Sequence, residues 1–90
     1  MNETQWVRRY YPNGQLDYEI PLVNRRKHGV ERGYYSNGQL SHEVPYVNGQ
    51  RHGVVRGYYS NGQLQYETLY VNGKIIPVNN KLSRLVLLGT

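Results

Sequence analysis

Three histidines and a set of regularly spaced carboxylates are the side chains whose chemistry could support catalysis or metal binding. His28 and His52 each precede a glycine and lie 24 residues apart, and His42 stands between them. If successive copies of a hairpin form one sheet, His28 and His52 lie two strands apart, roughly 10 Å, which is too far to share one ion. We therefore predict that no metal is bound and that the His-Gly pairs have a structural role at a turn.

The carboxylates follow the same 24-residue interval, since Glu19, Glu43 and Glu67 recur in step with three arginines. A catalytic pair of carboxylates needs two different environments, whereas a regular series gives every member the same one. The three glutamates are therefore expected to form a ladder of cross-strand ion pairs, and neither they nor Asp17 are expected to be catalytic. The serines Ser36, Ser41 and Ser60 have no evident base, and the glycines belong to turns and not to a phosphate-binding loop. We predict a protein that is not an enzyme, with no catalytic residue and no cofactor.

One pattern of basic and aromatic residues favours binding. In each copy an arginine precedes a tyrosine by two positions, which gives Arg8/Tyr10, Arg32/Tyr34 and Arg56/Tyr58. Such residues are enriched at protein interfaces, but they also hold phosphates and stack on bases. These six residues are our predicted partner-binding set, with a protein as the expected partner and nucleic acid or anionic lipid as the alternative. An ordinary solvated sheet face, with the arginines neutralised by glutamates, explains the pattern equally.

The elements that position these residues come from an internal repeat. Tyr10 to Leu16, Tyr34 to Leu40 and Tyr58 to Leu64 share the pattern Tyr-Tyr-x-Asn-Gly-Gln-Leu. Two turn signals alternate along the chain at intervals of about twelve residues. The first is Asn13-Gly14 and its copies; the second is Asn48-Gly49 and Asn72-Gly73, which becomes Asn24-Arg25 in the first copy. Asn-Gly between strand-like segments indicates a hairpin with a type I′ turn, so the chain should run up and down as an antiparallel meander.

The spacing also predicts a register. A two-residue turn at Asn37-Gly38 places Arg32 opposite Glu43, Gly33 opposite His42 and Tyr35 opposite Leu40. The equivalent pairs in the other hairpins are Arg8 with Glu19 and Arg56 with Glu67. The second turn, Asn48-Gly49, then predicts that Val44 faces Gly53 and that Leu40 faces Gly57.

Side chains alternate across a strand, so this register divides the residues between two faces. We expect one packed face and one wet face that carries the arginines, the glutamates, Tyr10, Tyr34 and Tyr58. The packed face should contain the following residues: Leu16, Tyr18, Ile20, Leu22, Leu40, His42, Val44, Tyr46, Leu64, Tyr66, Thr68 and Tyr70, joined by Tyr11, Tyr35, Tyr59 and Val55. Because a single layer leaves its apolar face uncovered and its edges open, we expect a homodimer or a partner-bound form.

Composition limits the remaining classes. The 90 residues fit one domain, and the lack of cysteine excludes disulfides and thiolate zinc sites. A net charge of +5 is a mild basic bias. No signal peptide and no transmembrane segment are evident, and we predict a cytoplasmic location. The predicted organisation is a single repeat domain over 1–90, with repeats at about 6–29, 30–53 and 54–77 and a C-terminal cap over 78–90 whose conformation the pattern does not define.

The repeated pattern of Tyr-Tyr, Asn-Gly-Gln-Leu and His-Gly elements, from about Trp6 to Gly73, resembles the MORN repeat and more closely its bacterial and phage variant. Proteins of that kind are often labelled YwqK-family antitoxins. The chain departs from the pattern at Arg25 and at Pro77, where glycines are expected. The resemblance implies a string of β-hairpins used for protein–protein contact or assembly, and the antitoxin label implies a partner toxin. Lipid-headgroup binding is also suggested for MORN proteins.

Together these observations predict an all-β protein, a single antiparallel β-meander of tandem hairpins. About six strands would form a twisted open sheet with a short C-terminal capping segment. The expected function is a non-enzymatic, MORN-like module for protein–protein interaction or assembly, antitoxin-like, in a bacterial or phage cytoplasm. The alternative is a basic module that binds nucleic acid or anionic lipid through the Arg-Tyr pairs.

Overall fold

The computed structural model describes residues 3–77, which form one antiparallel sheet. Three short strands branch at one end of the sheet from six longer ones. The strands are β1 (Gln5–Tyr10), β2 (Leu16–Val23), β3 (Arg26–Lys27), β4 (Gly29–Tyr34), β5 (Leu40–Val47), β6 (Gln50–Arg51), β7 (Gly53–Tyr58), β8 (Leu64–Val71) and β9 (Lys74–Ile76). The order β1-β2-β4-β5-β7-β8-β9 follows the chain, while β3 pairs with β2 and β6 pairs with β5.

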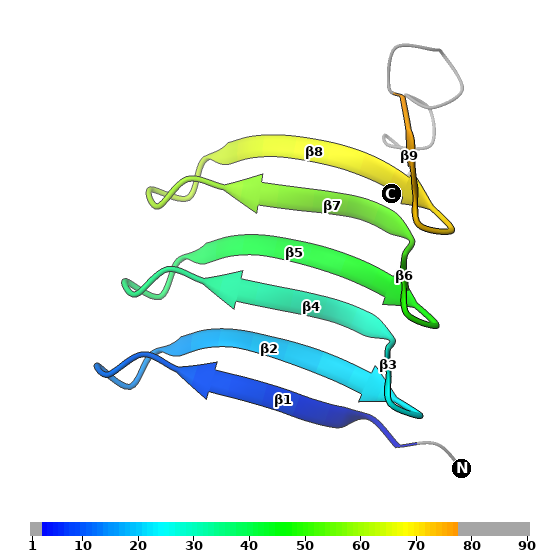
Figure 1. The fold of residues 1–90 in the computed structure, drawn as a ribbon. Helices are drawn as coiled ribbons and strands as arrows, with labels where there is room; N and C mark the ends of the chain where they lie inside the picture. Colours follow the sequence, from blue (N-terminus) through cyan, green and yellow to red (C-terminus); the bar gives the residue numbers. More distant parts are fainter. Residues whose placement is uncertain (1–2, 78–90) are drawn as a thin grey trace.

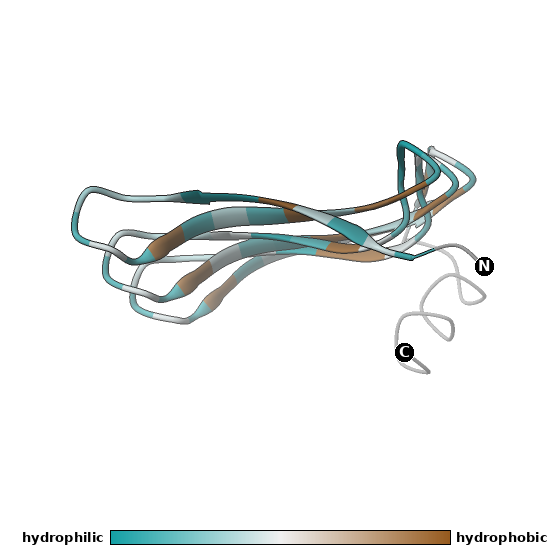
Figure 2. Cartoon of the chain, turned by 90° about the horizontal axis from the view of Figure 1, so that it is seen from below, coloured by the Kyte–Doolittle hydropathy of each residue, from teal (hydrophilic) through white to brown (hydrophobic). Residues whose placement is uncertain are grey.

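The molecule is a single layer. Figure 1 shows the six long strands side by side, with three loops at one end and the short strands β3, β6 and β9 turned upward at the other. Seen along its edge in Figure 2, the sheet is thin and curved, in agreement with a smallest extent of 17 Å. The predicted all-β meander of tandem hairpins is confirmed. The predicted cap, 78–90, lies outside the described residues.

The first turn of each repeat differs from the prediction. Tyr35 N–H donates to Gln39 O, so the loop has three residues, and among them only Gly38 has a positive φ, of 89°. This is a type I turn closed by a glycine, which Asn-Gly suits as well as it suits type I′. Tyr34, and not Tyr35, therefore faces Leu40. A bulge then adds Ser41 to β5 and restores the predicted pairs of Gly33 with His42 and Arg32 with Glu43.

The second turn has the predicted type I′ backbone. Asn48 and Gly49 have φ values of 48° and 87°. Asn24 and Arg25 keep the same conformation at 52° and 65°, although Arg25 is not a glycine. The hairpin geometry therefore outweighs the strain of a left-handed arginine.

The pairing beyond the second turn was predicted incorrectly. His42, and not Leu40, faces Gly57, and Glu43 faces Arg56. The chain turns a corner at the His-Gly pair, where Gly53 has φ of 119° and a Cβ there would lie 3.0 Å from Pro45 Cγ. The corner moves the register by two residues, an even number, so His42 and Glu43 keep their predicted faces. The bulge at Ser41, in contrast, places Leu40 on the face of Tyr34 and Arg32 and not on the predicted packed face.

The prediction that the face with the arginines and glutamates is wet was also wrong. Val44 and Val55, of the predicted packed face, are buried, with 5% exposure each. However, Pro21, Val54 and Leu69 are buried on the opposite face, in register with the charged residues. Both faces therefore contribute to a small core, as a chain of this size allows.

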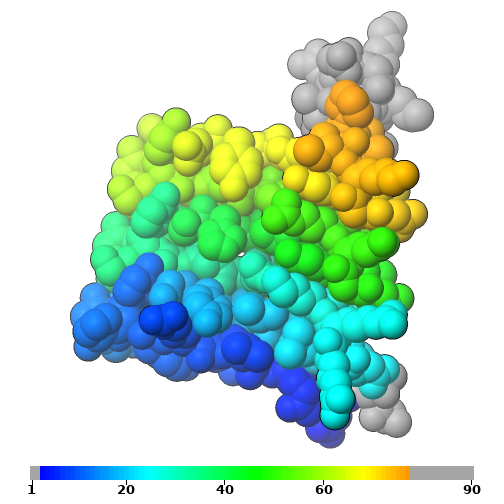
Figure 3. Space-filling model, in the orientation of Figure 1, coloured from blue at the N-terminus to red at the C-terminus, as the bar shows by residue number. Residues whose placement is uncertain are grey.

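A contact between repeats holds the hairpins together at the loop end. The hydroxyl of Tyr11 donates to Tyr34 O at 2.6 Å, and the hydroxyl of Tyr35 donates to Tyr58 O at the same distance. Beside these bonds, the side-chain amide of Asn13 donates to Ser36 O at 3.0 Å. Figure 3 shows the result, in which the repeats form successive bands across the surface.

Candidate functional site

The central feature of the sheet is a row of alternating charges across all six long strands, which we call the charge ladder. It consists of Arg8, Glu19, Arg32, Glu43, Arg56 and Glu67, in that spatial order. The row exists because the corner of each repeat places Glu19 beside Arg32 and Glu43 beside Arg56, in addition to the pairs within hairpins. The sequence predicted the pairs within hairpins but not their fusion into one continuous row.

The two inner carboxylates each lie between two guanidinium groups. Glu19 is 3.1 Å from Arg8 Nε and 3.9 Å from Arg32 Nη1. Glu43 is 3.6 Å from Arg32 Nε and 3.8 Å from Arg56 Nη1. At the end of the row, Arg56 Nε donates to Glu67 at 2.7 Å. The ladder therefore neutralises itself, and its arginines do not form a free basic strip.

The tyrosines of the predicted binding set have unequal surroundings. Tyr10 is 58% exposed, whereas Tyr34 and Tyr58 are half-buried. The hydroxyl of Tyr58 lies 3.5 Å from Glu43, on the ladder face. Burial and, to a smaller degree, the Glu43 carboxylate raise the pKa of Tyr58 above its ordinary value. The phenol thus remains a neutral hydrogen-bonding group beside the charges.

A row of apolar side chains runs beside the charge ladder on the same face. It comprises three cross-strand pairs: Trp6 with Pro21, Val30 with Pro45, and Val54 with Leu69. Between the two rows lies a hollow of about 290 Å³, lined by Val30, Glu43, Pro45, Gly53, Val54 and Arg56. Arg8 lies over the Trp6 ring, 4.8 Å from its centroid, so the two rows also touch at the edge strand. Sequence reasoning missed this row, although the recurring Pro21 and Pro45 were a visible signal.

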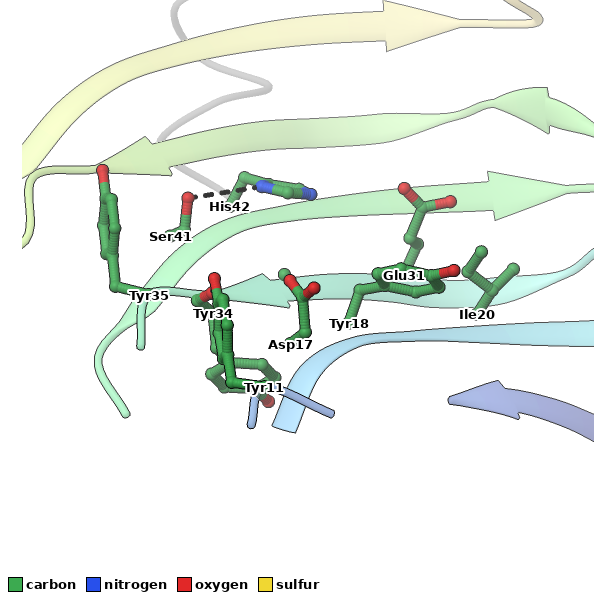
Figure 4. A pocket seen from close by; sticks show the side chains of 10 residues that line it. Tyr11, Asp17, Tyr18, Ile20, Glu31, Tyr34, Tyr35, Ser41 and His42 are labelled. Carbon is green, nitrogen blue, oxygen red and sulfur yellow. Dashed lines mark hydrogen bonds between the residues drawn. The ribbon is translucent and has the colours of Figure 1, made fainter. Parts of the chain in front are cut away.

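The opposite face has a larger hollow, of about 460 Å³, between the first and second repeats. Figure 4 shows its lining of Tyr11, Tyr18, Tyr35 and His42 with the carboxylates Asp17 and Glu31. Serine and valine stand at the positions of these two acids in the second repeat, so the acidic pair occurs once. The Glu31 carboxylate forms an ion pair with Lys27 Nζ at 2.7 Å, and this pair raises the pKa of the lysine above its ordinary value.

His28 and His52 have the structural role at a turn that the sequence predicted for the His-Gly pairs. His28 Nδ1 accepts a hydrogen bond from Asn48 N–H at 3.2 Å, and His52 Nδ1 accepts one from Asn72 N–H at 3.2 Å. Each histidine therefore supports the second turn of the following repeat. Within residues 3–77, no cluster of three or more metal-ligating side chains is present.

The fold and the surface define a class: an open sheet of tandem hairpins whose repeated face offers contacts along its length. The family model of the MORN repeat variant matches residues 7–24, 27–48 and 51–72, which is more than half of the 90 residues. The chain belongs to the MORN repeat variant family, whose repeats commonly act as binding or interaction modules and are generally non-enzymatic. No curated protein matches the chain. No solved structure matches it either. In the part of the chain that the structure describes, no helix is long and apolar enough to cross a membrane.

Proposed function

We propose that this protein is a non-enzymatic interaction module whose ladder face binds a partner protein. The observation that supports this proposal best is the combination of the charge ladder with the apolar row and the hollow between them. A protein partner presents both charge signs and apolar side chains, and Tyr and Arg are frequent at such contacts. Arg8, Tyr10, Arg32, Tyr34, Arg56 and Tyr58 form the polar part of this surface.

The alternative, a basic module for nucleic acid or anionic lipid, has less support from the same geometry. Polyanions are held by basic groups that are free to meet phosphates. In the ladder three arginines alternate with three glutamates, and each arginine has a carboxylate within 4 Å. A row without net charge gives a phosphate backbone little to bind.

An antitoxin-like role is the specific form of protein contact that we propose, with a toxin as the partner in a bacterial or phage cytoplasm. It is motivated by the resemblance of the repeats to those of proteins labelled as antitoxins. Such a role requires a surface that covers a partner without catalysing a reaction, and the ladder face is an extended surface with no catalytic group assigned to it.

The test starts with affinity capture from the native host, followed by titration of the identified partner with purified protein. The decisive variant exchanges all six ladder residues, so that each Arg becomes Glu and each Glu becomes Arg. Every ion pair within the sheet and the net charge are preserved, but the pattern is inverted. We expect the fold to persist, by circular dichroism, and partner affinity to fall at least about tenfold, the equivalent of one lost contact.

A partner that binds the exchanged variant with unchanged affinity would exclude the ladder face. Nucleic acid provides the comparison in the same variant, by gel shift at low salt. Since the net charge does not change, binding that depends only on overall charge should survive the exchange. A shift of wild-type protein that disappears in the exchanged variant, in the absence of any protein partner, would favour the alternative function.

A further inference from the structure

The charge ladder ends in opposite charges at the two edges of the sheet. Arg8, on β1, has one carboxylate neighbour, and Glu67, on β8, has one guanidinium neighbour within residues 3–77. The glutamate side chains become more exposed along the row, from 14% for Glu19 to 21% for Glu43 and 37% for Glu67. Within the described residues, the Glu67 carboxylate therefore has one guanidinium neighbour, whereas Glu19 and Glu43 have two each.

The hydrogen bonds between repeats end in the same complementary way. Tyr11 and Tyr35 each donate to the carbonyl of a tyrosine in the following repeat, but Tyr59, the third copy, is 49% exposed and has no such acceptor in the described residues. At the opposite edge, the carbonyl of Tyr10 is the copy of those acceptors. One edge of the sheet thus presents the donor and the other presents the acceptor.

Side chains of β8 near Glu67 are also exposed at this edge. Leu64 and Tyr66 are 48% and 47% exposed, whereas their copies in the first two repeats are more covered by the next hairpin. The short strand β9 pairs only with Leu69–Val71. β9 pairs with β8 in the same way as β6 pairs with β5. Since β5 pairs with the long strand β7 in addition to β6, a short strand at this position leaves room for a long one. Among residues 3–77, the part of β8 from Leu64 to Thr68 therefore has no strand on its outer side.

We propose that this free edge of β8 binds β1 of a second copy of the chain, head to tail. The joint repeats the pairing of β5 with β7, so Glu67 lies opposite Arg8 of the second copy, as Glu43 lies opposite Arg56. Tyr59 then donates to the Tyr10 carbonyl of that copy. Because the two surfaces of the joint differ, the association is heterologous and continues from copy to copy.

The other candidate for this edge is the segment 78–90 of the same chain. If the 24-residue spacing is extended into this segment, Asn80 and Lys81 stand where Arg56 and Gly57 stand one repeat earlier. That segment offers no guanidinium at the position that completes the ladder, whereas Arg8 of a second copy does. Arg9, which replaces the glycine in the first repeat, does not obstruct the joint because the ring of Tyr66 already lies over Gly57, away from the open edge.

Sedimentation of the full chain over a range of concentrations tests the proposal, with two single variants, Arg8→Glu and Glu67→Arg. In either variant alone, every joint brings like charges together, so both should remain monomeric where the wild type forms a series of oligomers. Mixing the two variants restores opposite charges at each joint, so the mixture should associate. Monomeric wild type, a mixture that stays monomeric, or single variants that still associate would each overturn the proposal.

A second pair of variants keeps the test valid if a charge reversal prevents folding. Tyr59→Phe should weaken association about tenfold, the equivalent of one hydrogen bond, and leave the melting temperature of the monomer unchanged. Its matched control, Tyr35→Phe, removes the bond to Tyr58 O and should lower the melting temperature without weakening the joint. If Tyr59→Phe instead lowers the melting temperature of a monomeric wild type, segment 78–90 occupies the edge and the proposal is wrong.

Discussion

Replacing Gly57 by alanine tests the packing of an aromatic ring against the sheet. A Cβ at this position would collide with the ring of Tyr66, which lies across the glycine from the opposite strand. Gly57 itself is buried and its φ lies outside the left-handed region, so alanine adds no backbone strain. The ring of Tyr66 must therefore leave its place, and the loss of its packing is the expected cost.

The size of that cost follows from the exposure of Tyr66, which is 47%. A tyrosine that buries about half of its roughly 200 Å² covers about 100 Å², which corresponds to at most about 2.5 kcal/mol. Alanine returns about 0.5–1 kcal/mol because it restricts the unfolded chain more than glycine does. We expect Gly57→Ala to destabilise the protein by about 1–2 kcal/mol, or roughly 5–15 °C in melting temperature.

Urea denaturation followed by circular dichroism measures this change in both the wild type and a Tyr66→Ala background. In that background the ring is absent, so the same Gly57→Ala substitution should be neutral or stabilising by up to about 0.5–1 kcal/mol. An equal destabilisation in both backgrounds would refute the explanation, because the ring would then not be the cause.

Three further predictions concern the ladder, a turn and alkaline pH. Arg32→Ala removes the cation that lies between Glu19 and Glu43 and should lower the free energy of unfolding in urea melts by about 0.5–1 kcal/mol. An unchanged free energy of unfolding would contradict a stabilising role of the shared cation. Arg25→Gly relieves a left-handed φ of 65° and should stabilise by about 1 kcal/mol, measured by thermal melting; a lower melting temperature would contradict this. The pKa of Lys27 is raised in the folded state. The contribution of Lys27 to folding stability is therefore complete below its ordinary pKa of 10.5 and is lost as the pH rises through the folded pKa. The melting temperature of the wild type should fall over that alkaline range, and it should fall less in Lys27→Met.

The strand order and the pairs within each hairpin could be predicted from the sequence because turn residues and charge pairs recur together. The loop type could not, since Asn-Gly suits both a two-residue turn and a three-residue loop. The wrong loop type did not affect the predicted pairing of Arg32 with Glu43, because Ser41 is an unpaired bulge residue that offsets the one-residue difference in loop length. The two-residue shift in strand register at the corner could not be predicted from the sequence, because it depends on how Pro45 packs against Gly53 in three dimensions.

The candidate site was predictable in its members but not in its connections. The spacing of Arg8, Arg32 and Arg56 identified the basic residues, and the hairpin register identified their first partners. The second partner of each inner glutamate comes from the next hairpin, whose offset depends on the corner. The apolar row was missed for a similar reason, because Val54 and Leu69 belong to the face that charge alone marks as exposed.

The bonds that join one repeat to the next also bear on how such a chain can change its length. The contact of Tyr11 with the second repeat is the same as the contact of Tyr35 with the third, with equal distances of 2.6 Å. A fourth unit copied in tandem into the gene would meet, on both sides, the surfaces that its neighbours already recognise. Duplication or loss of whole units through unequal recombination therefore requires no new interface, and only the first and last units need residues of their own.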